Sequence, residues 1–296
     1  MSTATGQSPQ PETAWQQVTI EFTDYTKAEQ IAAERLRPLL NAVAELWWFI
    51  RKAPNWRVRY LPIQSGTEAI RDTLAHMLGG LREERNITNW VETIYEPEIH
   101  AFGGTAAMAV AHQLFHCDSQ HILGNSRTCD RRRELTILLC SALMRGAGQD
   151  WYEQGDIWAR LAENRPLPPD INTDQLRTPR SGLRRLMSVD ADPTSPLVKP
   201  GGQMADSATW LAAFHRAGAE LGVLSRAGAL HRGLRAVLTH QAIFHWNRIG
   251  LSYTTQSVLA HAAKATVFDD YPSGERPNFL GIVPPQDTEA AEPADV

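Results

Sequence analysis

The sequence predicts an α+β fold that is predominantly helical, with a small antiparallel sheet in the N-terminal third. Before residue 98, apolar and polar residues alternate in several short segments, and a strand directs successive side chains to opposite faces. After Gly103 and Gly104, apolar residues recur three and four positions apart, which is the spacing of one helical face. Strands followed by helices in one chain are typical of α+β domains.

Three segments predict the strands. In the first, Val18, Ile20 and Phe22 alternate with other residues and therefore share one face. The second contains a Lys-Ala-Pro-Asn turn, which predicts two strands joined at that turn. The expected strand segments are residues 15–22, 47–63 and 87–98.

Apolar residues at helical spacing predict seven helices. Gly79 and Gly80 are expected to end the second of these helices, because glycine favours helix termination. The expected helices are 28–43, 66–81, two helices around 108–115 and 135–143, and then roughly 207–222, 230–246 and 254–268.

One folded domain is expected over residues 15–270. Residues 1–14 are short, polar and rich in Gln, Thr and Pro, and residues 271–296 end in an acidic run, so both are expected to be disordered tails. Seven of the 18 prolines lie between positions 165 and 205. Proline and glycine interrupt regular structure, so a long loop or a lid is expected around residues 166–205.

The composition excludes several functional classes. A formal net charge of −4 argues against general nucleic-acid binding, which usually needs a basic surface. No apolar run approaches the roughly 18 residues that cross a membrane, and the first residues lack the parts of a signal peptide. Three cysteines without a CxxC pair match no zinc site. We therefore expect a cytoplasmic protein that contacts neither nucleic acid nor membrane directly.

Arg57 and Arg59 form the first candidate site. They are two residues apart in a predicted strand, so both side chains leave the same face. Two guanidiniums there can bind a dicarboxylate, or a carboxylate and an enolate, through forked hydrogen bonds. A solvated strand face is the alternative, but the neighbouring Trp56 and Tyr60 favour a half-buried strand, where an arginine pair needs an anionic partner.

His245 is the second candidate. It follows Gln241 by one helical turn and Leu238 by two, so it is expected on the side of the helix that packs inward. Arg248 follows three residues later. A histidine with a cation and an amide close by can donate or accept a proton, and a hydrogen-bonded core histidine is the alternative.

Two other segments carry polar residues. Glu96 and Glu98 share a strand face if the strand continues past Pro97, and otherwise belong to a structural turn. The second segment contains His112, His116, Asp118, Ser119 and His121. Its composition allows a metal site or a Ser–His pair. We expect neither, because HQLFH lacks the glutamate of the HExxH zinc motif and no nucleophile-elbow sequence surrounds the serine.

Six segments occur in an order that resembles the C-terminal domain of lantibiotic dehydratases, a domain that also occurs alone as the thiopeptide-type bacteriocin biosynthesis protein. The segments are WWFIRK with WRVRY, YEPEIHAFGG, LFHCDSQHIL, RRREL, DWYEQGDIWARLAENRP and FHWNRIGL. The likeness covers roughly residues 15–268.

The resemblance implies glutamate elimination. In that family, a glutamylation domain transfers glutamate from glutamyl-tRNA to Ser or Thr of a precursor peptide, and the elimination domain then removes it to leave dehydroalanine or dehydrobutyrine. By resemblance, Arg57 and Arg59 match the arginines assigned to the glutamyl group, and His245 matches the region of the catalytic histidine. The implied substrate-binding residues are Tyr95, Glu98, Asp118, Ser119, Asn247 and Arg248.

The resemblance also implies the partners. This chain is too short to include the large glutamylation domain, so a separate tRNA-dependent glutamylation protein is expected beside the precursor peptide, and no metal or organic cofactor is needed. One departure is Ala101, where full-length dehydratases often have an arginine before the Tyr/Phe-Gly-Gly turn. It leaves two alternatives open: a pyridine synthase that joins two dehydroalanines by a formal [4+2] cycloaddition, and a non-catalytic precursor-binding subunit.

Overall fold

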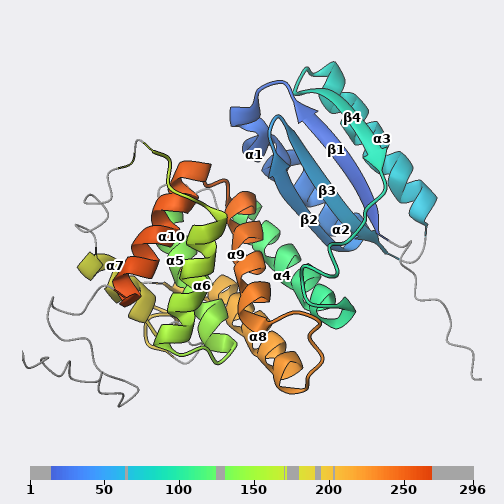
Figure 1. Cartoon of the computed structure of the whole chain (residues 1–296). Helices are drawn as coiled ribbons and strands as arrows, with labels where there is room; N and C mark the ends of the chain where they lie inside the picture. The colour runs from blue at the N-terminus through green and yellow to red at the C-terminus, as the bar shows by residue number, and fades with distance from the viewer. Residues whose placement is uncertain are drawn as a thin grey trace, which may run out of the picture.

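A computed structural model describes residues 15–63, 66–124, 131–169, 171, 180–190, 195–202 and 204–268. It contains an antiparallel sheet with the strand order β2-β3-β1-β4 and a helical part beside it (Figure 1). The strands are β1 (Gln16–Phe22), β2 (Ala44–Lys52), β3 (Asn55–Pro62) and β4 (Ile87–Thr93). The predicted α+β class, mostly helical with an N-terminal antiparallel sheet, is confirmed.

The helices divide into two groups. Near the sheet lie α1 (Ala28–Ile31), a π-helical turn (Ala32–Leu36), α2 (Arg37–Val43) and α3 (Thr67–Glu83). The helical part contains α4 (Thr105–Gly124), α5 (Arg132–Gly146), α6 (Trp151–Asn164), α7 (Arg180–Ser188), α8 (Ala208–Arg226), α9 (Leu234–Ile249) and α10 (Tyr253–Phe268).

The two faces of the sheet have different roles. Val18, Trp56 and Val58 belong to one face and join the same buried core as the leucines of α3. The pairing of Trp48 with Arg59 places both on the opposite face, and Trp48 joins a second cluster formed with residues of α4 and α9. The alternation of the strands therefore separates a face that packs in the core with α3 from a face that contains Trp48 and Arg59.

Three expectations about local structure are wrong. Helix α3 continues through Gly79 and Gly80, because the glycines keep ordinary helical backbone angles and the buried Leu78 and Leu81 hold the helix in the core. Strand β4 ends at Thr93, so the glutamates near Pro97 do not belong to it. The proline-rich stretch is not a loop throughout, since it includes α7. Parts of that stretch and both predicted tails lie outside the described residues.

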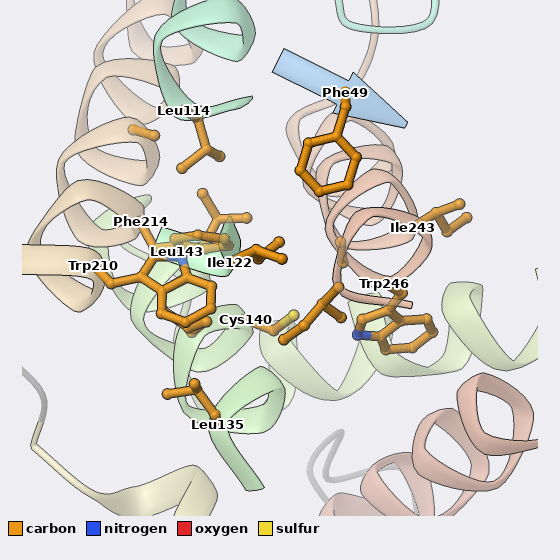
Figure 2. Packing of buried hydrophobic residues seen from close by; sticks show 14 of the residues in the cluster. Phe49, Leu114, Ile122, Leu135, Cys140, Leu143, Trp210, Phe214, Ile243 and Trp246 are labelled. Atoms are coloured by element: carbon orange, nitrogen blue, oxygen red, sulfur yellow. The ribbon is translucent and has the colours of Figure 1, made fainter. Parts of the chain in front are cut away.

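Helices α5 and α8 approach each other at two glycines. A Cβ on Gly218 would lie 2.0 Å from the carbonyl oxygen of Leu143, and a Cβ on Gly146 would lie 2.1 Å from the carbonyl oxygen of His215. Figure 2 shows the core beside this crossing, where Leu143 of α5 and Phe214 of α8 are close together. Only glycine allows the two backbones to come this near.

The substitution Gly218→Ala should therefore lower the free energy of unfolding by about 1–3 kcal/mol, because the methyl group would meet backbone atoms rather than a flexible side chain. Gly79→Ala is the matched control, since a Cβ there would meet nothing within 4 Å, and it should be neutral or stabilising by up to about 1 kcal/mol. Urea unfolding followed by circular dichroism measures both. Equal effects of the two substitutions would contradict the close crossing.

Candidate active site

Asp118 is the centre of a fully buried ionic network. His245 Nδ1 lies 3.0 Å from both carboxylate oxygens, Arg248 Nη1 lies 2.5 Å from Oδ2, and Trp210 Nε1 donates to Oδ1 at 2.9 Å. Burial raises the pKa of Asp118, but His245 and Arg248 outweigh it and hold the pKa below its usual range. The sequence placed His245 on the inward side of its helix, and the structure confirms that position at 1% exposure.

Arg248 of this network and two side chains of α4 close the outer edge of β2. Ser119 Oγ accepts a hydrogen bond from the Phe49 amide at 3.3 Å, and Arg248 Nε donates to the Phe49 carbonyl at 3.1 Å. His116 Nδ1 lies 3.1 Å from the Trp47 amide and 3.0 Å from its carbonyl oxygen. Side chains of α4 and α9 thus replace a neighbouring strand along this edge.

Arg59 lies on the sheet face that points toward α4. Its side chain is 4% exposed, and Nε donates to Gln17 Oε1 at 2.6 Å. The guanidinium carbon lies 4.3 Å from the ring centre of Trp48 and 4.5 Å from that of Tyr95. Burial lowers the pKa of Arg59 below its usual value. No carboxylate of the described residues forms an ion pair with Arg59, and Nη1 is enclosed without a hydrogen-bond partner.

Arg57 occupies the same face but not the same environment. The alternation of β3 confirms that Arg57 and Arg59 point to one side, yet Arg57 is exposed while Arg59 is buried. The structure therefore brings only Arg59 into an enclosed site.

An aromatic chamber surrounds the two buried guanidiniums. We define it by its rings, which are Trp48, Tyr95, Phe102, Phe115 and Phe244. Arg248 lies 4.3 Å from the ring centre of Phe115 and 5.6 Å from that of Trp48. Trp48 therefore contacts Arg59 and Arg248 together. Cations over aromatic faces are stabilised, but this contact does not replace an anionic partner.

His112 is the partner of Tyr95 in the chamber wall. The Tyr95 hydroxyl lies 2.8 Å from His112 Nε2, and the Trp15 ring packs 4.4 Å from the imidazole. Burial, and then the charge of Arg59, lower the pKa of His112 to about 4. Burial raises the pKa of Tyr95 above its usual range. Both side chains are therefore neutral at neutral pH.

A cavity of about 440 Å³ opens beside this wall. It is lined by Trp15, Gln16, Gln17, Tyr60, Arg71, Glu92, Thr93, Ile94 and Tyr95. Two of these residues, Gln17 and Tyr95, also contact Arg59. The cavity therefore reaches two residues that contact the buried guanidinium, while Arg59 itself does not line it.

The remaining predicted residues lie in different places. Glu98 is partly buried with Oε2 enclosed and unpaired, and its charge acts on both Arg59 and Tyr95. Asn247 points toward α10, where Oδ1 accepts a hydrogen bond from Gln256 at 3.1 Å. Glu98 therefore interacts with residues of the site, whereas Asn247 bonds to α10.

The described residues contain neither a metal-ligand cluster nor a membrane-spanning helix. No group of three or more His, Cys, Asp and Glu side chains there could hold a metal ion. Within the same part of the chain, no helix has the length and apolar character needed to span a membrane.

Residues 15–267 match the family model described as the C-terminal part of lantibiotic biosynthesis dehydratases. The chain belongs to this family. No curated protein matches it. Membership agrees with the resemblance drawn from the six segments, and it supports a role in lantibiotic biosynthesis.

Three solved structures share the fold. The tRNA-dependent lantibiotic dehydratase MibB from Microbispora sp. 107891 has a TM-score of 0.63 and 18% identity, over 90% of this chain and 29% of MibB. The pyridine synthase TbtD from thiomuracin biosynthesis has a TM-score of 0.66 and 14% identity, over 87% of this chain and 98% of TbtD. TsrL has a TM-score of 0.61 and 15% identity, over 87% of this chain and 99% of TsrL. The chain thus spans less than a third of MibB.

Sequence reasoning missed two residues that bind site residues, Gln17 beside Arg59 and His112 beside Tyr95. Gln17 lies in a segment read only as a strand, and His112 was considered only as a metal ligand. Strand alternation places Gln17 opposite Arg59, so pairing of β1 with β3 would have found it. The partnership of His112 with Tyr95 joins residues from separate segments and has no local signal in the sequence.

The neutral state of His112 predicts how stability depends on pH. Its pKa is about 4 in the folded protein and about 6.5 in an unfolded chain, so the unfolded state binds more protons between these values. The free energy of unfolding should therefore fall as the pH is lowered from about 6.5 to 4, by at most about 1.4 kcal/mol per pH unit from this residue.

Urea unfolding at several pH values in this range tests the prediction. His112→Gln should flatten the pH dependence, and a part should persist because burial also lowers the pKa of His240 to about 4. His76→Gln, at an exposed position of α3, is the control and should leave the slope unchanged. An unchanged slope in His112→Gln would contradict the low pKa.

Proposed function

We propose that the protein removes glutamate from glutamylated Ser or Thr residues of a ribosomally made precursor peptide, forming dehydroalanine or dehydrobutyrine. It would be a lyase that acts after a separate tRNA-dependent glutamylation protein. MibB is described as a tRNA-dependent lantibiotic dehydratase, and this chain matches 29% of it. Because glutamyl-tRNA is made in the cytoplasm, we propose that the protein also works there.

The main support for this proposal is the buried guanidinium of Arg59. A buried guanidinium without a carboxylate partner is costly, and an anionic ligand would compensate it. The side chain is arranged for such a ligand, since Gln17 fixes Nε while Nη1 remains unpaired. A glutamyl ester retains a free carboxylate that can accept hydrogen bonds from the guanidinium.

The reaction that we propose is a β-elimination. The Cα–H bond breaks, its electron pair forms the Cα=Cβ bond, and the Cβ–O bond breaks to release glutamate as a carboxylate. We assign the proton to Glu98, whose carboxylate has an unpaired enclosed oxygen and acts electrostatically on Arg59 and Tyr95. The substrate enters through the 440 Å³ cavity.

His245 has a different role in this proposal. It was expected to transfer the proton, but its side chain is 1% exposed and Nδ1 is bonded to Asp118. We therefore propose that His245, Asp118 and Arg248 position Trp48 and the edge of β2, while Arg57 contacts the peptide near the surface. The burial of this group supports a positioning role, since a proton-transfer residue must reach the proton that it moves.

Pyridine synthesis is the second candidate. The match covers 98% of TbtD, which is described as a pyridine synthase, and Ala101 takes the place of an arginine that the dehydratases often have. A bis-dehydroalanine peptide assayed for loss of the diene absorbance and ring closure separates this activity from elimination. Ring closure without elimination would replace the proposed function.

The first test uses a short synthetic peptide that carries a glutamyl ester on a central serine. The parent protein should convert it to the dehydroalanine peptide with release of glutamate, as measured by mass spectrometry. The same peptide with free serine should remain unchanged, even with added glutamate and tRNA. Persistence of the ester beyond its rate of spontaneous loss would contradict elimination.

Substitution of Arg59 tests the carboxylate contact. Arg59→Gln should slow elimination about 10- to 100-fold, because a charge-assisted hydrogen bond to a buried carboxylate contributes about 1.5–3 kcal/mol. Arg59→Lys should restore only part of the rate, since lysine lacks the forked geometry. Arg82→Gln, at an exposed position of α3, is the control. Parent-like rates in Arg59→Gln would exclude this residue from the site.

A further inference from the structure

The Tyr95–His112 pair lies between the aromatic chamber and the cavity. Its hydrogen bond is 2.8 Å long, and the two side chains are 6% and 9% exposed. Trp15 packs against both rings, with centroid distances of 5.9 Å to Tyr95 and 4.4 Å to His112. Tyr95 also lines the cavity and contacts Arg59 at 4.5 Å. Tyr95 therefore has its hydroxyl fixed by His112, and its ring lies next to the proposed carboxylate-binding group.

We propose that the Tyr95 hydroxyl donates a hydrogen bond to the carbonyl oxygen of the residue that undergoes elimination, and that His112 positions this hydroxyl. The inference rests on the proposed function. When the Cα proton leaves, negative charge develops on that carbonyl oxygen. A fixed donor directed at developing charge is most effective in a site that excludes water.

The direction of the hydrogen bond decides whether Tyr95 can donate to a substrate. We assign the ring proton of His112 to Nε2, so that the imidazole donates to the phenol oxygen and leaves the hydroxyl hydrogen free. An imidazole that remains neutral can hold this arrangement across the neutral pH range. Burial and then Arg59 keep the pKa of His112 at about 4, which satisfies this condition.

The charge state of Tyr95 agrees with a donor rather than a base. Burial raises its pKa, which Arg59 opposes and Glu98 reinforces. The hydroxyl therefore keeps its proton at neutral pH. Proton removal then falls to Glu98, while Tyr95 stabilises the oxygen and Arg59 holds the leaving glutamate, so the three groups have separate roles.

A hydrogen bond of this kind could instead serve only the stability of the chamber. Removal of the Tyr95 hydroxyl should have different effects under these two roles. Removal of a donor that acts on developing charge slows the chemical step and leaves peptide binding nearly unchanged. Removal of a core hydrogen bond lowers the free energy of unfolding and leaves the chemical step of the folded protein intact.

The experiment measures single-turnover elimination and binding with the synthetic glutamyl-ester peptide on the full-length protein. Tyr95→Phe should reduce the elimination rate about 10²-fold, with less than a threefold change in Kd. His112→Phe should reduce the rate to a similar extent, and His112→Gln should recover much of it, because an amide N–H can replace the imidazole donor. Tyr25→Phe, a partly buried tyrosine packed against the core that does not line the cavity, is the matched control.

The double variant Tyr95→Phe/His112→Phe tests whether His112 acts through Tyr95. It should be no slower than Tyr95→Phe alone, since each substitution removes the same oriented donor. Strictly multiplicative losses would overturn the positioning role of His112. Should Tyr95→Phe fail to fold, the comparison of His112→Gln with His112→Phe decides the same question.

Two results would overturn the inference while leaving elimination in place. One is a Tyr95→Phe protein that eliminates glutamate within threefold of the parent rate. The other is a loss that arises entirely from weaker peptide binding. Failure of the parent protein itself to eliminate glutamate is a different result, read in the first assay, and it rejects the proposed function together with this inference.

Discussion

The packing of the sheet against the helices depends on the buried carboxylate of Asp118, whose charge must be compensated inside the protein. A charge without solvent contact is tolerated only when paired and hydrogen-bonded, and His245, Arg248 and Trp210 supply the donors. Arg248 then also binds the Phe49 carbonyl of β2. The hydrogen bonds that compensate Asp118 between α4, α8 and α9 are therefore linked through Arg248 to the position of the edge strand β2.

The two buried guanidiniums, Arg248 and Arg59, differ in whether they pair with this carboxylate. Arg248 already has Asp118 as its counter-ion, so an external anion would have to compete with an internal ion pair. Arg59 lies across the Trp48 ring, and among the described residues its one hydrogen-bond acceptor is the neutral Gln17. Of the two buried cations, Arg248 thus has an ion pair within the protein, whereas Arg59 has no carboxylate within salt-bridge distance among the described residues.

Local patterns in the sequence predict the elements and the direction of side chains, but not the partners. Alternation in β3 places Arg57 and Arg59 on one face, and helical spacing turns His245 inward. Arg59 is buried by Gln17, Trp48 and Tyr95, which belong to other segments of the chain, so the strand sequence alone does not predict which of the two arginines is exposed. The Asp118–His245 pair joins residues 127 positions apart. Helix α3 passes through two glycines because burial of its leucines outweighs their low helix propensity.

The alanine at position 101 does not leave the turn without a cation. Arg232, in the segment before α9, donates from Nη1 to the Ala101 carbonyl oxygen at 2.8 Å. Gly103 and Gly104 follow with φ of +92° and +111°, a conformation that favours glycine, and the Gly103 carbonyl accepts the His231 amide at 2.9 Å. A guanidinium is therefore held at this turn from a different part of the chain.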